Sequence, residues 1–300
     1  LLFGHDEELG GEEGAKHIAR LLAERGVTLE FLLDEGLFVL DGLLPGFAQP
    51  VAMICVAEKG MATIRLSIDP KADLDPTAHA STPPAESAIG IVARAASRLE
   101  RSPFPTHSDS MCLLLGALRG GFGWPLQPLM SNLWLFAPLL KLVFAAKPRT
   151  ATLVRTTTAL TVFRAGAKSN VLPQTAAAIV NHRLHPRDSV AAVKARDVRV
   201  INDPRVRVEV IHATEPSPVS SVDHPAFASL RHAVHEVFPG AAVAPGLFIA
   251  ASDSKHFWGL AAQIYRFSPI ALHVDQTKMF HGHSERIGVE AHAKNVAFMR

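Results

Sequence analysis

The chain of 300 residues is long enough for one large or two ordinary domains, and its 48% hydrophobic residues can build a sizeable core. With 30 basic and 28 acidic residues it lies outside the disordered class, and no basic tract indicates nucleic acid or an anionic membrane surface. Cys55 and Cys112 lie in apolar stretches, which predicts buried free thiols and excludes a disulfide scaffold.

The first third of the chain has the pattern of an α/β layer. Residues 1–6 resemble the end of a strand and carry no initiator Met, so we expect a piece of a longer protein. Apolar spacing then predicts a helix over 12–25, stopped by Gly26, and buried strands over 29–33 and 51–56.

Beyond residue 57 the pattern changes to that of an α+β module. The predicted strands are 63–68, 159–163, 178–184 and 206–211, and the predicted helices are 86–100 and 190–198. The α/β pattern returns with a helix over 227–238, strands over 247–250 and 263–267, and a helix from 287 onward. We therefore predict an α/β fold in which a discontinuous catalytic domain, 1–56 and 214–300, carries an inserted α+β lid domain, 57–213.

Residues 125–146 form the most apolar window of the chain. A membrane span needs about 20 uninterrupted apolar residues, and this window is broken by two internal prolines, Ser131-Asn132 and Lys141. We predict no membrane span here, but a buried loop and helix under the lid.

The motif with the most chemical content is His5-Asp6-Glu7-Glu8-Leu9-Gly10-Gly11, expected at a strand end before a helix. Adjacent carboxylates leaving a strand face different ways, so one can ligate a metal while the other takes a proton from metal-bound water. The alternative is a solvated acidic turn that caps the next helix.

Two further segments could complete such a site. Asp34-Glu35-Gly36 supplies a second carboxylate pair, expected at the end of the next strand, and His281 lies in the segment Phe280–Arg286 before the closing helix. Carboxylates at adjacent strand ends together with an imidazole suit a crevice at the edge of an open α/β sheet.

These motifs, in this order, resemble the zinc metallopeptidase family that includes aminoacylases, carboxypeptidase S, carnosinases and N-fatty-acyl-amino-acid hydrolase. The likeness extends along essentially the whole chain. The segments that carry it are 5–11, 33–36, 57–60, 79–84, 156–163, 170–173, 181–186, 253–254 and 280–286, with 131–136 and 264–267 closest to the carboxypeptidase S and fatty-acyl-amino-acid hydrolase branch.

The resemblance implies roles for the acidic residues and the C-terminal histidine. Glu7 matches the general base, and Glu8 matches a zinc ligand. The pair Asp34-Glu35 matches the position of another ligand, and of the two we favour Glu35. His281 matches the last ligand. The family's two remaining ligands would lie upstream of residue 1, so two zinc ions are expected only in a longer chain.

In the lid, the resemblance implies substrate-binding roles. His79 matches the histidine that polarises the scissile carbonyl, often across a dimer interface, although Thr77-Ala78 stand where the family usually has two glycines. Arg183 would hold a substrate carboxylate, with Asn170 as its hydrogen-bonding companion. The alternatives are a surface histidine near a turn and a surface strand arginine.

Two functions follow as hypotheses. The first is zinc-dependent hydrolysis of the amide bond of N-acyl amino acids or short peptides with a free C-terminal carboxylate, by a homodimer that binds no nucleic acid. The second is a catalytically incomplete relative that serves as a binding or dimerisation module.

Overall fold

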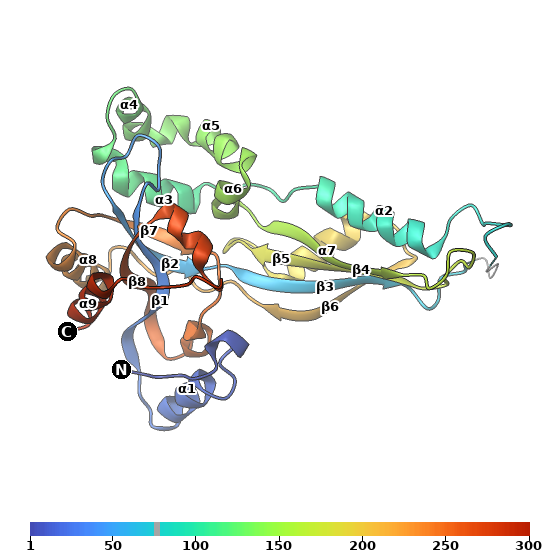
Figure 1. Ribbon diagram of the computed structural model, residues 1–300, viewed down its shortest axis with the longest axis horizontal. Coiled ribbons are helices and arrows are strands. Elements are labelled where there is room, and N and C mark those ends of the chain that lie inside the picture. Colours follow the sequence, from blue (N-terminus) through green and yellow to red (C-terminus); the bar gives the residue numbers. More distant parts are fainter. Residues whose placement is uncertain (75–78) are drawn as a thin grey trace. The chain divides into compact units, whose positions relative to one another are not determined.

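The computed structural model describes residues 1–74 and 79–300 (Figure 1). The chain divides into two compact units, each with its own sheet. The division differs from the expected one, because residues 108–144 belong to the unit that holds both chain ends and not to the module predicted over 57–213. Unit 1 comprises Leu1–Glu58, Ser108–Phe144 and Ser217–Arg300, and unit 2 comprises Lys59–His107 and Ala145–Pro216.

Unit 1 is built on a mixed sheet of four strands, β1 (Leu29–Asp41), β2 (Val51–Glu58), β7 (Ala242–Phe248) and β8 (Ala261–His273). The order is β1-β8-β2-β7, with β1 parallel to β8, β2 parallel to β7, and β1 also paired antiparallel to β2. Every residue of β2 is buried, as expected for a strand covered on both faces.

Helices cover both faces of this sheet. Ile264 of β8 packs with α1 (Ala15–Glu24), whereas the next residue, Tyr265, packs with Phe227 of α8 (Pro225–Val237). Because successive strand side chains point to opposite faces, α1 and α8 lie on opposite sides. The other helices are α3 (Asp109–Leu118), α4 (Leu126–Ser131), α5 (Leu133–Ala146, whose last two residues belong to unit 2) and α9 (Val289–Phe298), with 3-10 turns at Glu7–Leu9, Arg119–Gly121, Asp253–Phe257 and Val274–Met279.

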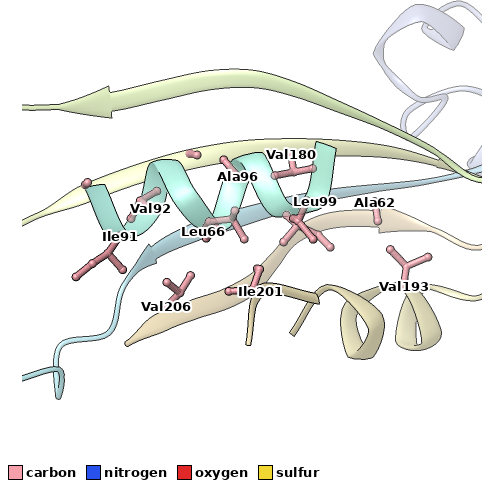
Figure 2. Packing of buried hydrophobic residues seen from close by; sticks show 14 of the residues in the cluster. Ala62, Leu66, Ile91, Val92, Ala96, Leu99, Val180, Val193, Ile201 and Val206 are labelled. Atoms are coloured by element: carbon pink, nitrogen blue, oxygen red, sulfur yellow. The ribbon is translucent and has the colours of Figure 1, made fainter. Parts of the chain in front are cut away.

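Unit 2 has an antiparallel sheet of β3 (Gly60–Ile68), β4 (Thr157–Ala165), β5 (Ala176–Leu184) and β6 (Val206–Thr214) in the order β4-β5-β3-β6. Buried residues alternate along β5, which leaves one face of the sheet for the core. Figure 2 shows that face packed against α2 (Ala88–Arg101) and α7 (Val190–Ile201). The remaining helix is α6 (Pro148–Val154).

Most of the predicted strands and helices are confirmed, with four corrections. The strand predicted over 247–250 is β7, which begins at Ala242 and ends at Phe248. Residues 1–6 contain no strand. Strand β1 does not end at residue 33 but continues to Asp41 through a register shift between Asp34 and Leu37. The window 125–146 forms two helices with much of its apolar surface exposed instead of a buried segment. None of the helices in the described part of the chain is both long and apolar enough to cross a membrane.

Candidate active site

A tight turn presents Glu7 and Glu8. The Leu9 N–H donates to the Asp6 carbonyl (3.0 Å), and the Gly10 N–H donates to the Glu7 carbonyl (2.8 Å). Gly10 has φ +103°, a conformation that glycine adopts without strain. An Asp6 carboxylate oxygen accepts from the Glu13 N–H (2.8 Å) ahead of α1, so Glu7 and Glu8 remain available for other roles. Asp6 thus stabilises the turn ahead of α1, whose N-cap Gly14 receives no side-chain hydrogen bond.

Glu35 lies on β1 beside the acidic turn. Partial removal from water, reinforced by repulsion from Glu7, Asp34, Glu8 and Asp253, raises the pKa of Glu35 to about 7. Burial, followed by Glu8, Asp253 and Asp34, also raises the pKa of Glu7, against an opposing effect of a lysine. Glu7, Glu8, Asp34 and Asp253 are thus close enough for their charges to influence the pKa of Glu35.

The pair Asp34-Glu35 is positioned by an irregularity in β1, not by the end of a strand. The register shift follows Asp34, and Gly36 packs so closely on β8 that an added Cβ would lie 2.3 Å from the Arg266 carbonyl carbon. The Glu35 N–H donates to Asp34 Oδ1 (2.8 Å). This bond occupies one Asp34 oxygen and leaves the Glu35 carboxylate available, which favours Glu35 as the ligand.

His281 approaches Glu8 from the far end of the chain. Its Nδ1 lies 3.8 Å from Glu8 Oε1, and both side chains are exposed. The backbone of His281 has φ +58°, an uncommon conformation for a residue with a side chain, and its N–H donates to Glu285 Oε2 (3.1 Å). Two of the expected metal ligands, 273 positions apart in sequence, are therefore neighbours.

The donor set has the chemistry of a divalent cation site. Zinc binds carboxylate oxygen and imidazole nitrogen, and a cation would relieve the repulsion that raises the pKa values of Glu7 and Glu35. Within residues 1–74 and 79–300, no three His, Cys, Asp or Glu side chains are grouped so as to enclose an ion. Glu8 and His281 fit such an ion as a pair, with Asp34-Glu35 nearby.

Asp253, which the sequence analysis did not place in the site, packs against Gly11 at the end of the acidic turn. Its Oδ1 is buried without a hydrogen-bond partner among the described residues, and a Cβ at Gly11 would lie 1.9 Å from that oxygen. Burial first, then Asp34 and Asp6, raise the pKa of Asp253. Gly11, with φ +69°, was the sequence feature that could have indicated a close neighbour here. One glycine is enough to end the turn, and the motif contains two in succession.

A buried polar network holds the residues on either side of Asp253. Glu58 Oε2 accepts from Arg266 Nε (2.7 Å), from Ser252 Oγ (2.8 Å) and from Ser254 Oγ (3.3 Å). Arg266 is fully buried, and its two terminal nitrogens have no hydrogen-bond partner in the described structure. The position of the Asp253 loop therefore depends on an ion pair between β2 and β8.

Arg183 lies in unit 2, near the end of β5, where it pairs with Met61 of β3. Its charge is close enough to Lys59 to contribute, after burial, to lowering the pKa of Lys59 to about 7. The Lys59 ammonium donates to the carbonyls of Thr152 (3.0 Å) and Arg155 (2.8 Å). Arg183 thus lies in a cluster of basic residues with Lys59 and Arg155, beside Asp188, and such a cluster suits an anionic group of a substrate.

His79 and Asn170 lie together, at the other end of the same sheet. His79 forms a β-bridge with Val171, the Ala80 N–H donates to the Asn170 carbonyl (3.2 Å), and His79 Nδ1 lies 2.6 Å from Ser81 Oγ. Asn170 precedes β5 and Arg183 is near its end, so the two residues lie at opposite ends of this strand in one chain, and the pairing of Asn170 with Arg183 stays a prediction. The Thr77-Ala78 pair lies outside the described residues.

Sequence comparisons find relatives whose names describe hydrolases and carboxypeptidases. It is 44% identical over 291 residues to the N-fatty-acyl-amino acid synthase/hydrolase PM20D1 of Xenopus tropicalis, covering 96% of this chain and 56% of that protein. It is 41% identical over 304 residues to the human PM20D1 protein, covering 100% and 59%. A probable carboxypeptidase S-like 2 protein of Dictyostelium discoideum is 40% identical over 299 residues, covering 99% and 57%. The chain thus spans somewhat more than half the length of these relatives.

Solved structures support the fold. The M20 family metallo-carboxypeptidase Sso-CP2 from Sulfolobus solfataricus superposes with a TM-score of 0.61 at 13% identity, covering 98% of this chain and 67% of that one. Human carnosine dipeptidase 1 gives 0.54 at 14% identity, covering 98% and 64%. The α/β fold class is therefore confirmed. The model of peptidase family M20/M25/M40 matches residues 1–300, and the chain belongs to this family.

Proposed function

We propose that this protein catalyses metal-dependent hydrolysis of the amide bond in N-acyl amino acids or short peptides that end in a free carboxylate. The observation that carries the proposal is the acidic site of unit 1, in which Glu7 and Glu8 share a turn and His281 faces Glu8. The names of the relatives, which describe fatty-acyl-amino acid hydrolysis and carboxypeptidase activity, support the same substrate class.

Zinc is the proposed cofactor, with two ions per site in the full-length protein. Glu8, His281 and one of Asp34 and Glu35 would hold it, because their oxygen and nitrogen donors suit this metal. Zinc, when bound, supplies Lewis-acid chemistry that activates water and polarises a carbonyl.

Glu7 is the proposed proton carrier. A general base works best when its pKa lies near the working pH, and burial together with Glu8 and Asp253 raises the pKa of Glu7 from its ordinary value. Glu7 would take a proton during attack on the amide carbon and return it to the leaving amine nitrogen.

Unit 2 would supply the groups that bind the substrate. Arg183 would bind its carboxylate, and His79 would donate to the carbonyl oxygen as negative charge develops there. Residues 176 and 183 of β5 are separated by about 23 Å at the rise of a strand, and His79 lies beyond the residue 176 end. One small substrate would therefore take Arg183 and His79 from different chains, which supports a homodimer.

The test replaces one carboxylate at a time. In the full-length protein, since residues 1–300 alone are expected to be inactive, Glu7→Gln should retain zinc and lose about 10²- to 10⁴-fold in kcat, because a positioned base is removed. Glu8→Gln should instead lower the zinc content measured by mass spectrometry. Glu13→Gln is the matched control, since Glu13 is an exposed carboxylate close in sequence. Near-normal turnover by Glu7→Gln would refute the base assignment. A zinc-loaded protein that hydrolyses neither N-acyl amino acids nor dipeptides would favour a binding or dimerisation module.

A further inference from the structure

Helix α5 exposes an apolar stripe. Trp134, Leu135, Pro138, Leu139, Leu142 and Val143 recur at intervals of one and three or four residues, so they lie along one side of the helix. Trp134 is 80% exposed and Leu142 65% exposed, whereas Leu140 and Phe144 on the other side are buried. We call the six exposed residues the α5 stripe.

Helix α5 differs from α2, a helix of equal length, in the side chains that it exposes. Helix α2 has the same length, 14 residues, buries residues such as Ile91 and Leu99, and exposes Arg94 and Arg98 on its outer side. The only charged residue of α5 is Lys141, and it is partly buried. A contiguous exposed apolar surface of this kind on a folded protein marks a site of interaction with a partner or a membrane.

The charges that flank the stripe in the sequence favour an anionic partner. Nine of the 30 Lys and Arg residues and none of the 28 Asp and Glu residues lie between Asp109 and Asp188. Lys141 is on α5, and Lys147 directly follows its last residue and is exposed. The chain-wide net charge of +2 conceals this segregation.

The length of α5 decides how it would meet a bilayer. At a rise of 1.5 Å per residue its 14 residues extend about 21 Å, short of the hydrocarbon core of about 30 Å. A helix with Trp and Leu on one side and nearby lysines suits the plane of the interface, where apolar side chains enter the acyl region and ammonium groups reach the lipid phosphates.

From these observations we propose that the α5 stripe docks the protein on the surface of an anionic phospholipid membrane. Trp134, Leu135, Leu139 and Leu142 insert below the headgroups, while Lys141 and Lys147 contact lipid phosphates. The proposal does not depend on the amidohydrolase activity.

The test is flotation of the purified protein with vesicles of phosphatidylcholine containing about 30% phosphatidylserine. The triple variant Leu135→Gln, Leu139→Gln, Leu142→Gln should lower the partition constant at least about tenfold, because three apolar side chains no longer leave water. Its control, Val198→Gln, Val289→Gln, Val296→Gln, changes three exposed apolar residues on other helices and should bind like wild type. Lys141→Gln should lower binding about fivefold, an effect that salt suppresses.

Several results would overturn the proposal. These are wild-type protein that stays unbound, a triple variant that binds like its control, and equal binding to neutral vesicles. Light scattering tests the alternative that the stripe binds a second copy of the chain. This alternative would hold if the wild type self-associates and does not bind vesicles, and if the triple variant no longer self-associates. Circular dichroism checks folding, and if the triple variant is unfolded, the salt-dependent effect of Lys141→Gln decides.

Discussion

Replacing Glu58 by Gln tests whether the buried ion pair supports unit 1. Glu58 is 3% exposed and Arg266 is fully buried, with Nε 2.7 Å from Glu58 Oε2. Gln keeps the size of the side chain and removes its charge. The guanidinium would then remain in the interior with no anion beside it, while its terminal nitrogens already have no hydrogen-bond partner in the described structure.

The expected loss is large. Removing one partner of a buried ion pair typically costs about 3–5 kcal/mol, since the other charge stays uncompensated. Ser252 and Ser254 also donate to Glu58; a Gln oxygen can accept these bonds, so we expect the lower part of this range. A loss of about 3 kcal/mol is a considerable part of the 5–15 kcal/mol that stabilises ordinary domains.

Urea unfolding followed by tryptophan fluorescence measures this loss. The three tryptophans, Trp124, Trp134 and Trp258, all belong to unit 1, so the signal reports the unit that contains the pair. The midpoint should fall at an unchanged slope. Glu290→Gln is the control, because the Glu290–Lys294 pair is exposed and should contribute less than about 1 kcal/mol.

A double variant separates the pair from its surroundings. Arg266→Met in the Glu58→Gln background removes the uncompensated charge and should recover part of the lost stability. If Glu58→Gln unfolds at the same urea concentration as Glu290→Gln, the network does not stabilise unit 1 and the reasoning fails.

Three further predictions concern unit 2. Arg183→Ala should raise KM for free-acid substrates by the equivalent of about 1.5–3 kcal/mol and leave C-terminally amidated substrates almost unchanged; an equal loss on both would make Arg183 structural. Mixing inactive Glu7→Gln and His79→Ala proteins should restore about a quarter of the active sites if His79 acts across a dimer, and no recovery would exclude this arrangement. Burial lowers the pKa of Lys59 to about 7 from its ordinary value of 10.5. Between these two pH values the unfolded chain therefore binds more protons than the folded chain. The free energy of unfolding measured in urea should rise with pH across that window, and it should rise less steeply in Lys59→Met.

The elements of the fold could be predicted where periodicity is local. The strand over 178–184 and the helix over 86–100 follow from alternating and helical spacing within a few residues. The assignment of residues 108–144 to unit 1 could not be predicted, because an apolar helix such as α3 carries no local mark of the strand, β7, against which it packs. For the same reason the exposure of α5 was mistaken for burial.

Candidate site residues could be proposed from the sequence where chemistry is concentrated at consecutive positions. Glu7-Glu8 and Asp34-Glu35 are adjacent pairs, and the charges of Glu7, Glu8 and Asp34 all contribute to the raised pKa of Glu35. Asp253 was not assigned, since one carboxylate between two serines resembles an exposed turn. Its place in the site comes from contacts with residues about 240 positions earlier in the chain.

Glu58 and Lys59 show why residues whose surroundings cannot be predicted from the sequence often have important roles. A Glu-Lys-Gly sequence resembles a solvated turn, yet both charged residues are only 3% exposed. Glu58 is held by Arg266, 208 positions away, and Lys59 by carbonyl groups 93 and 96 positions away. Buried charges survive only with such partners, which local patterns cannot reveal. Glu58 has its partners in unit 1 and Lys59 has its partners in unit 2. The chain therefore passes from one unit to the other at the peptide bond between these two residues. Charged residues that break the hydrophobic pattern at strand ends are therefore the positions to test first in this chain.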